Sequence, residues 1–279
     1  MRIHHLNCGC MCPLGGRLMD GVSSGLTAHL VCHCLLIETD HGLVLVDTGF
    51  GMRDVQQPYE RLSPFFIHFN RIQFERRDTA LEQVRARGFS PRDVRHIVLT
   101  HLDFDHAGGL EDFPDAKVHV LQSEAETAET SGGLISGRRY RPEQWDEVRH
   151  WCLYEPGGER WFGFDAVRDL DGLPPEILMV PLRGHTIGHA GVAIKTPEGW
   201  LLHAGDAYFY RHEMDPKPSC TPGLAAYQRM MGQDHQARRR NQARLRALAN
   251  SQDDMRIFCS HDPVELEALS RLSSGWRPV

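Results

Sequence analysis

The sequence predicts an α/β fold in which buried strands carry polar side chains to one shared site. Four apolar, largely β-branched or leucine-rich runs support this, each ending just before a histidine or aspartate: 95–99, 177–182, 199–203 and 255–259. With 279 residues, 41% of them hydrophobic, the chain is long enough for a large core in one two-layered α/β domain. We therefore predict a single domain over 1–279, with insertions at about 50–77 and 131–165 flanking the site.

The N-terminal elements follow from short apolar runs and turn residues. The predictions are a strand over 2–7, a Gly- and Cys-rich loop over 8–25, and a hairpin of strands 28–38 and 42–47. Residues 50–77 combine prolines with many aromatic side chains, which is typical of a long binding loop or lid. A dimer contact or a small satellite core explains these aromatics equally well.

The remaining elements are predicted mainly from helix caps and strand patterns. Thr79 caps a helix that Gly88 ends, Ser90 and Pro91 start a short helical turn, and Ser123 with Glu126 forms a capping box. The insertion at 131–165 reads as loop-rich. A second sheet is predicted from 177–182, 191–195 and 200–203, followed by helices over 224–249 and from Pro263.

The strongest chemical signal is the loop Thr100–Gly109, which follows the first of the four strands. His101, Asp103, Asp105 and His106 place four possible metal ligands within six residues. Carboxylates and imidazoles packed this closely would repel or stay unsatisfied unless a cation lay among them. A polar loop with helix-capping aspartates is the simpler alternative.

Three later strand ends argue against that alternative. Each carries a histidine or an aspartate, within Gly184–His189, Ala204–Ala207 and Ser260–Asp262. Four strand ends that bring six or seven nitrogen and oxygen ligands together describe a two-metal hydrolytic site.

These motifs, in this order, resemble the metallo-β-lactamase-fold hydrolases. The resemblance extends from about residue 28 to 262 and includes Asp47-Thr48-Gly49 at the end of an apolar strand. It implies an αββα sandwich of two mixed β-sheets flanked by helices. Within this superfamily, the segment 88–109 is most similar to the N-acyl homoserine lactone lactonases.

The resemblance also implies a ligand set, with one departure. His101, Asp103 and His185 would hold the first metal, Asp105, His106 and His261 the second, and Asp206 would bridge them. The family's usual second histidine is Asp103 here, which adds a negative charge. Zinc is the expected ion, but iron or manganese would suit the extra carboxylate, and a weak or empty first position is a further alternative.

In this chemistry, two divalent ions hold a bridging hydroxide that attacks a carbonyl. Asp105 is a candidate proton shuttle as well as a ligand, and Asp206 contacts both ions. Related lactonases use a tyrosine after the bridging aspartate, and we expect Tyr208 or Tyr210 in that role, since Phe209 stands at the usual position. Asp47 is expected to orient a ligand or to cap its strand.

The leading function is therefore opening of a lactone or similar ester, such as an acyl homoserine lactone. The alternatives are hydrolysis of a thioester, phosphodiester or β-lactam, non-haem iron redox chemistry, and ligand binding with weak catalysis. The net charge of −6 argues against nucleic acid as a partner. With no apolar span and no signal segment, we expect a cytoplasmic protein with reduced cysteines that acts on a small molecule. A homodimer and a monomer both remain open for it.

Overall fold

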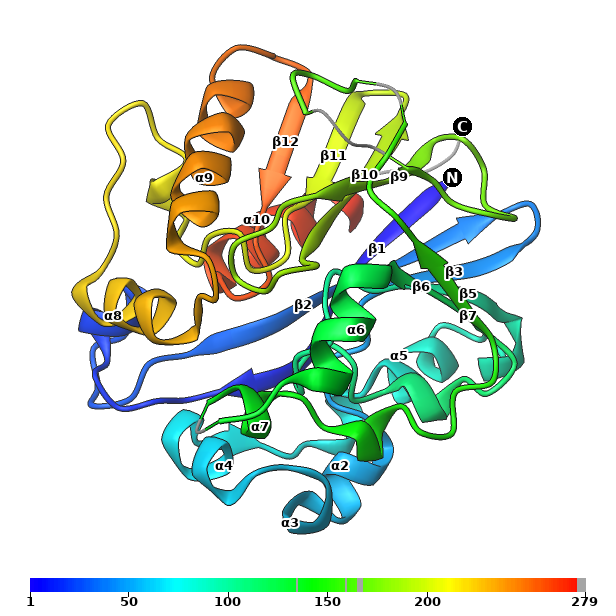
Figure 1. The fold of residues 1–279 in the computed structure, drawn as a ribbon, viewed down its shortest axis with the longest axis horizontal. Helices are drawn as coiled ribbons and strands as arrows, with labels where there is room; N and C mark the ends of the chain where they lie inside the picture. The colour runs from blue at the N-terminus through cyan, green and yellow to red at the C-terminus, as the bar shows by residue number, and fades with distance from the viewer. Residues whose placement is uncertain (134, 159, 165–167, 275–279) are drawn as a thin grey trace.

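Two stacked β-sheets with helices on their outer sides make up the computed structural model of the chain (Figure 1). It describes residues 1–133, 135–158, 160–164 and 168–274. Helix α9 packs on strand β12 of one sheet, while α5 and α6 pack on strands β1 and β6 of the other. The predicted α/β class with two mixed sheets is therefore confirmed.

The first sheet has seven strands in the order β4-β1-β2-β3-β5-β6-β7. Their bounds are β1 (Arg2–Met11), β2 (Leu30–Thr39), β3 (Gly42–Val46), β4 (Ile72–Gln73), β5 (Val94–Val98), β6 (Lys117–Leu121) and β7 (Trp151–Tyr154). Strands β4, β1, β2 and β3 pair antiparallel, whereas β3, β5, β6 and β7 pair parallel.

The second sheet has five strands in the order β12-β11-β10-β9-β8. They are β8 (Arg168–Asp169), β9 (Ile177–Pro181), β10 (Ala190–Thr196), β11 (Gly199–His203) and β12 (Met255–Phe258). Only the pair of β11 and β12 is parallel among the pairings described for this sheet.

The α-helices connect and cover these strands. They are α1 (Arg17–Asp20), α2 (Met52–Gln56), α3 (Pro58–Arg61), α4 (Pro64–Asn70), α5 (Ala80–Ala86), α6 (Gln122–Thr130), α7 (Ser136–Arg139), α8 (Pro222–Met231), α9 (His235–Ala249) and α10 (Pro263–Ser274). Short 3₁₀ helices lie at Arg76–Asp78, Pro91–Asp93, Leu110–Asp112, Pro142–Gln144 and Arg211–Glu213. Within the described residues, no helix combines the length and apolar character needed to cross a membrane.

Strand β2 shows how the core is layered. Leu35 and Ile37 pack between the two sheets, while Cys34 and Leu36 pack on the opposite side with the residues of α5. All four side chains are at most 1% exposed. A strand buried on both faces needs a continuous apolar run instead of an alternating one, which is the pattern that β2 has.

Several predicted boundaries are wrong, for identifiable reasons. Residues 50–77 are not a loop but contain α2, α3 and α4, because Pro58 and Pro64 each stand at a helix start, where proline is favoured. The predicted capping box of Ser123 and Glu126 does not form, since α6 already begins at Gln122. Strand β1 runs on to Met11, into the predicted loop.

The 131–165 insertion is more ordered than predicted. It contains α7 and strand β7, which adds a parallel edge to the first sheet. Residues 134, 159 and 165 of this insertion lie outside the described residues. By contrast, the 42–47 hairpin strand, the Thr79 cap of α5 and the start of α10 at Pro263 agree with prediction.

The topology brings the polar loops to one edge. The metal-motif loop follows β5, and the other three follow β9, β11 and β12. Strand β3, which is parallel to β5, ends beside it at Asp47. The carboxyl ends of neighbouring parallel strands meet at the same edge of a sheet, which is where binding sites of α/β proteins form.

We predict that His119 makes the fold sensitive to acid. Burial, together with the nearby His96, lowers the pKa of His119 to about 3. The folded protein therefore keeps it neutral, while the unfolded chain protonates it below about pH 6.5. The contribution of His119 to the free energy of unfolding is therefore complete above that pH and is lost as the pH falls. In urea unfolding, the free energy of unfolding should fall between pH 7 and 4.5. This fall should be smaller in His119→Gln than in wild type by roughly 2 kcal/mol.

An exposed histidine supplies the control for this measurement. His41 lies at the turn between β2 and β3 and is exposed. His41→Gln should leave the pH dependence of unfolding unchanged. If the free energy of unfolding changed with pH equally in His119→Gln and wild type, His119 would not be the source of the acid sensitivity.

Candidate metal centre

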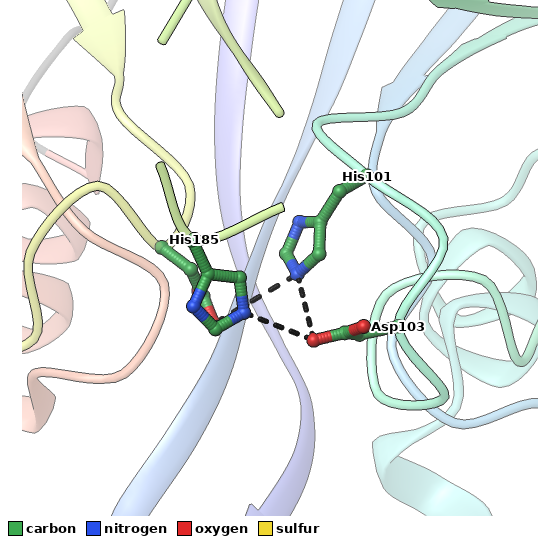
Figure 2. A group of neighbouring side chains, drawn as sticks. His101, Asp103 and His185 are labelled. Carbon is green, nitrogen blue, oxygen red and sulfur yellow. Dashed lines mark hydrogen bonds and ion pairs between the residues drawn. The ribbon is translucent and has the colours of Figure 1, made fainter. Parts of the chain in front are cut away.

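Four buried side chains from three loops converge on the first position of the site. His185 Nε2 lies 2.9 Å from Asp103 Oδ2 and 3.3 Å from Asp206 Oδ2. His101 Nε2 lies 3.3 Å from the same Asp103 oxygen and 3.8 Å from Asp206 Oδ2. Figure 2 shows the two imidazoles and the Asp103 carboxylate pointing toward one another.

A second position lies on the other side of Asp206. His261 Nε2 is 3.1 Å and His106 Nε2 is 3.4 Å from Asp206 Oδ1. Asp105 Oδ2 is 3.6 Å from His261 Nε2. The seven residues predicted as metal ligands therefore all lie in one buried cluster: His101, Asp103, Asp105, His106, His185, Asp206 and His261.

The chemistry of this cluster fits metal ions. His101 Nε2, His106 Nε2 and Asp206 Oδ1 are buried without a hydrogen-bond partner. Such orphaned polar atoms are costly unless something binds them. Ligands about 2.0–2.1 Å from a tetrahedral ion lie about 3.3 Å from one another. The nitrogen–oxygen separations in both groups bracket that value.

Two of the four histidines, His106 and His261, are oriented by hydrogen bonds on their other ring nitrogen. His106 Nδ1 lies 2.8 Å from Asp47 Oδ2, and His261 Nδ1 lies 2.7 Å from the carbonyl oxygen of Val31. Asp47 also accepts hydrogen bonds from the backbone and the hydroxyl of Thr100, each at 2.8 Å. Asp47 thus has the orienting role expected of it, and each Nε2 is left free to face the site.

Glu124 joins two of the ligand loops. This fully buried carboxylate accepts hydrogen bonds from Leu102 N, Thr186 Oγ1 and Gly188 N, at 3.0, 2.5 and 3.1 Å. Burial raises its pKa to about 7. The loop that carries His101 and Asp103 is therefore tied directly to the loop that carries His185. Sequence patterns did not indicate this residue.

Asp206 is held by His189, whose two ring nitrogens both have hydrogen-bond partners. The backbone N–H of Asp206 donates to His189 Nε2 at 2.9 Å. Gly205 precedes Asp206 with φ of +54°, and a Cβ there would meet His189 Nε2 at 2.6 Å. Glycine is thus required both for the left-handed backbone and for the close approach.

Asp103 is paired with a buried cation that the sequence did not indicate. Arg139, at the end of α7, donates from Nε to Asp103 Oδ1 at 2.5 Å and from Nη2 to Asp103 Oδ2. Burial alone would raise the pKa of Asp103, but the guanidinium and His101 hold it well below the usual range. The two residues are 36 positions apart. A spacing pattern could not reveal the pair, although a buried extra carboxylate does call for a cation.

The predicted catalytic role of Tyr208 does not fit the structure. Its side chain is fully buried with α9 against the outer face of the second sheet, and its hydroxyl donates to Glu265 Oε1 at 2.9 Å. The Tyr210 hydroxyl instead lies against Gly21. It is Phe209 that reaches the site, stacking on the His261 ring with centroids 5.1 Å apart.

Asp105 and Cys32 lie together beside the second position. One oxygen of Asp105, a nitrogen of His261 and the Cys32 sulfur all lie within 4.8 Å of one another. Burial raises the pKa of both Asp105 and the Cys32 thiol. Cys32, one of the cysteines expected to be reduced, is buried and borders the candidate metal cluster.

Comparison with known proteins is consistent with this geometry. The family model described as the metallo-beta-lactamase superfamily matches residues 28–261. A protein named as a probable metallo-hydrolase of Mycobacterium tuberculosis is 40% identical over 97% of this chain and 83% of its own length. An N-acyl homoserine lactonase of Bacillus thuringiensis is 31% identical over 73% of this chain and 76% of its own length.

Solved structures share the fold at lower sequence identity. An N-acyl homoserine lactone hydrolase with its product N-hexanoyl-L-homoserine superposes with a TM-score of 0.71 at 21% identity. That match covers 96% of this chain and 95% of the other. A dizinc quorum-quenching lactonase superposes with a TM-score of 0.64 at 17% identity, covering 94% and 87%.

We predict that Glu124→Ala loosens the metal centre. The change leaves three buried donors without an acceptor, at about 1–3 kcal/mol each before relaxation. Thermal unfolding should occur at a lower temperature, and the metal content after dialysis should fall. Glu126→Ala, an exposed change on the same helix, is the control. Retention of wild-type metal content in Glu124→Ala would show that the hydrogen bonds of Glu124 between the two loops are not needed for metal binding.

Proposed function

The chain belongs to the metallo-β-lactamase superfamily and is a metallo-hydrolase of that fold, and we propose that it opens lactone rings with two divalent ions. The observation that carries the two-ion proposal is the position of Asp206. Its Oδ2 lies 3.3 Å from His185 Nε2 and 3.8 Å from His101 Nε2, and its Oδ1 lies 3.4 Å from His106 Nε2. His261 Nε2 lies near both oxygens, at 3.1 Å from Oδ1 and 3.2 Å from Oδ2. A carboxylate that histidines approach at both oxygens could serve as a ligand to each of two ions.

The chain's own groups divide the work of hydrolysis between them. Bound divalent ions would supply a water-derived nucleophile at neutral pH and polarise the substrate carbonyl. Asp206 would contribute a ligand to each ion. Asp105 is the proposed proton carrier, taking a proton from the attacking water and giving it to the alkoxide that leaves when the ring opens.

A series of aromatic side chains supports a substrate with an apolar tail. It starts at the surface with Phe65 and Phe69, which are 36% and 44% exposed and stack at 5.4 Å. Tyr227 lies 6.2 Å from Phe69 and 5.7 Å from Phe209, which stacks on His261. Apolar rings thus lead from solvent to the metal cluster, as a carbonyl carrying an acyl chain would need.

Zinc is the proposed ion. Imidazole nitrogens and carboxylate oxygens are common zinc ligands, and one structural neighbour is described as a dizinc lactonase. If the extra carboxylate of Asp103 determined which metal the site prefers, elemental analysis would find iron or manganese instead.

The first test is elemental analysis of the purified protein alongside a panel of N-acyl homoserine lactones. We expect about two ions per chain and ring opening, followed as acid release. His261→Ala removes a ligand of the second position, so turnover should fall by several orders of magnitude and about one ion should be lost. His68→Ala, an exposed change on α4, is the control. Full turnover by His261→Ala would exclude the two-ion mechanism.

We predict that Phe69→Ala discriminates substrates by tail length. Losing this ring removes apolar contact worth about 1–3 kcal/mol from a long acyl chain but little from a short one. The ratio of kcat/KM for decanoyl over butanoyl lactone should therefore fall about 10- to 100-fold. Phe162→Ala, an exposed aromatic packed on Trp161 and Trp200, controls for general effects. An unchanged ratio of kcat/KM would show that these aromatic side chains do not contact the acyl chain of the substrate.

A further inference from the structure

We propose that Arg139 is a positioning residue of the first metal position, and that Asp103 and Arg139 together replace one neutral histidine ligand. The proposal rests on the two-ion part of the function proposed above, and not on the substrate. Arg139 is 1% exposed and lies in the 131–165 insertion. Arg139 therefore contacts the candidate ligand Asp103 from the protein interior, away from solvent.

Every nitrogen of the guanidinium has a partner. Nε and Nη2 bind the two oxygens of Asp103, and Nη1 donates to the carbonyl oxygen of Met231 at 2.6 Å. This two-point contact fixes the plane of the carboxylate as well as its place, which a lysine could not do. Nη2 also lies 2.7 Å from His185 Nε2, and the side chain is buried, so in this proposal Arg139 acts through Asp103 and does not bind a substrate itself.

The backbones of the two residues are also joined. Phe104 N donates to the carbonyl oxygen of Arg139 at 3.1 Å, and Asp103 forms an isolated antiparallel bridge with Tyr140. The insertion is thus attached to the metal-motif loop at the ligand itself. A surface connector would not need contacts on both the backbone and the side chain.

The charges of the site explain why the pair is needed. Asp103, Asp105 and Asp206 carry three negative charges, and Arg139 reduces the total to minus two. A site with a histidine at position 103 and no arginine would also carry minus two. Two divalent ions therefore meet the same total charge in either arrangement, so Asp103 by itself does not make the first ion a weaker Lewis acid.

The pairing of Asp103 with Arg139 reverses the effect on zinc binding that ligand types alone would predict for Asp103→His. Asp103→His would recreate a three-histidine ligand set, which by itself favours zinc. With Arg139 still present, however, the variant would leave an unpaired buried guanidinium next to the ion. Its Nη2 lies only 2.7 Å from His185 Nε2 and would repel a cation bound there.

The test compares wild type, Asp103→His, Arg139→Met and the double variant, each saturated with zinc and then desalted. Zinc per chain and the rise in Tm caused by zinc are measured. We expect Asp103→His to lose about one ion, and the double variant to regain it. Arg139→Met should be less stable without metal, because Asp103 is then unpaired, and should show the largest rise in Tm on zinc binding.

Arg61→Met provides a matched control. Arg61 is also buried, at 2% exposure, and also pairs with a carboxylate, Asp54, but it lies on α3 outside the ligand cluster. This variant should lower Tm with and without zinc by similar amounts and leave the zinc content unchanged. Arg139→Lys keeps the charge but not the two-point contact, so it should bind zinc more weakly than wild type and more strongly than Asp103→His.

The outcomes separate this inference from the proposed substrate. Rescue of zinc binding in the double variant supports the pairing, whether or not any lactone is opened. Two ions in Asp103→His, or no gain in the double variant, would overturn it even if lactones are hydrolysed. One ion in wild type but two in Arg139→Met would overturn it as well, because the guanidinium would then occupy the first position.

Discussion

The structure depends on keeping seven ionisable or metal-binding side chains buried together at the edge of two stacked sheets. Each of them is at most 5% exposed, and several face the site with atoms that have no hydrogen-bond partner. Such an arrangement is unfavourable in an empty protein interior and becomes favourable when cations bind. Folding and metal binding are therefore linked, because the same contacts serve both.

Much of the remaining chain supports this arrangement without touching it. Asp47 orients His106, Glu124 joins two ligand loops, and His189 holds the backbone of Asp206. These groups are buried and hydrogen-bonded, so each restricts the positions that a ligand can take. Precise ligand positions matter for hydrolysis because the nucleophile and the proton carrier must stay within reach of one carbonyl.

The segment between 131 and 165 has a larger part in the site than its loop-rich composition indicates. Through Arg139 it reaches the first metal position, and through β7 it extends the first sheet. The aromatic residues of α4 approach the same site from the chain's other insertion. The loops after the strands thus carry the candidate ligands, while the two insertions contribute Arg139, which pairs with Asp103, and exposed aromatic side chains.

The sequence by itself determined the fold class and indicated the candidate ligands and their order, because these depend on local patterns: an apolar strand followed at once by His or Asp. It also indicated Asp47, which stands at such a strand end. Only the tertiary structure decided the partners that come from distant segments, such as Arg139 for Asp103 and Glu124 for Thr186. It likewise decided between neighbours in the chain, placing Phe209 at the site and turning Tyr208 into the core. Side-chain direction in an irregular loop follows from packing, which no local spacing encodes.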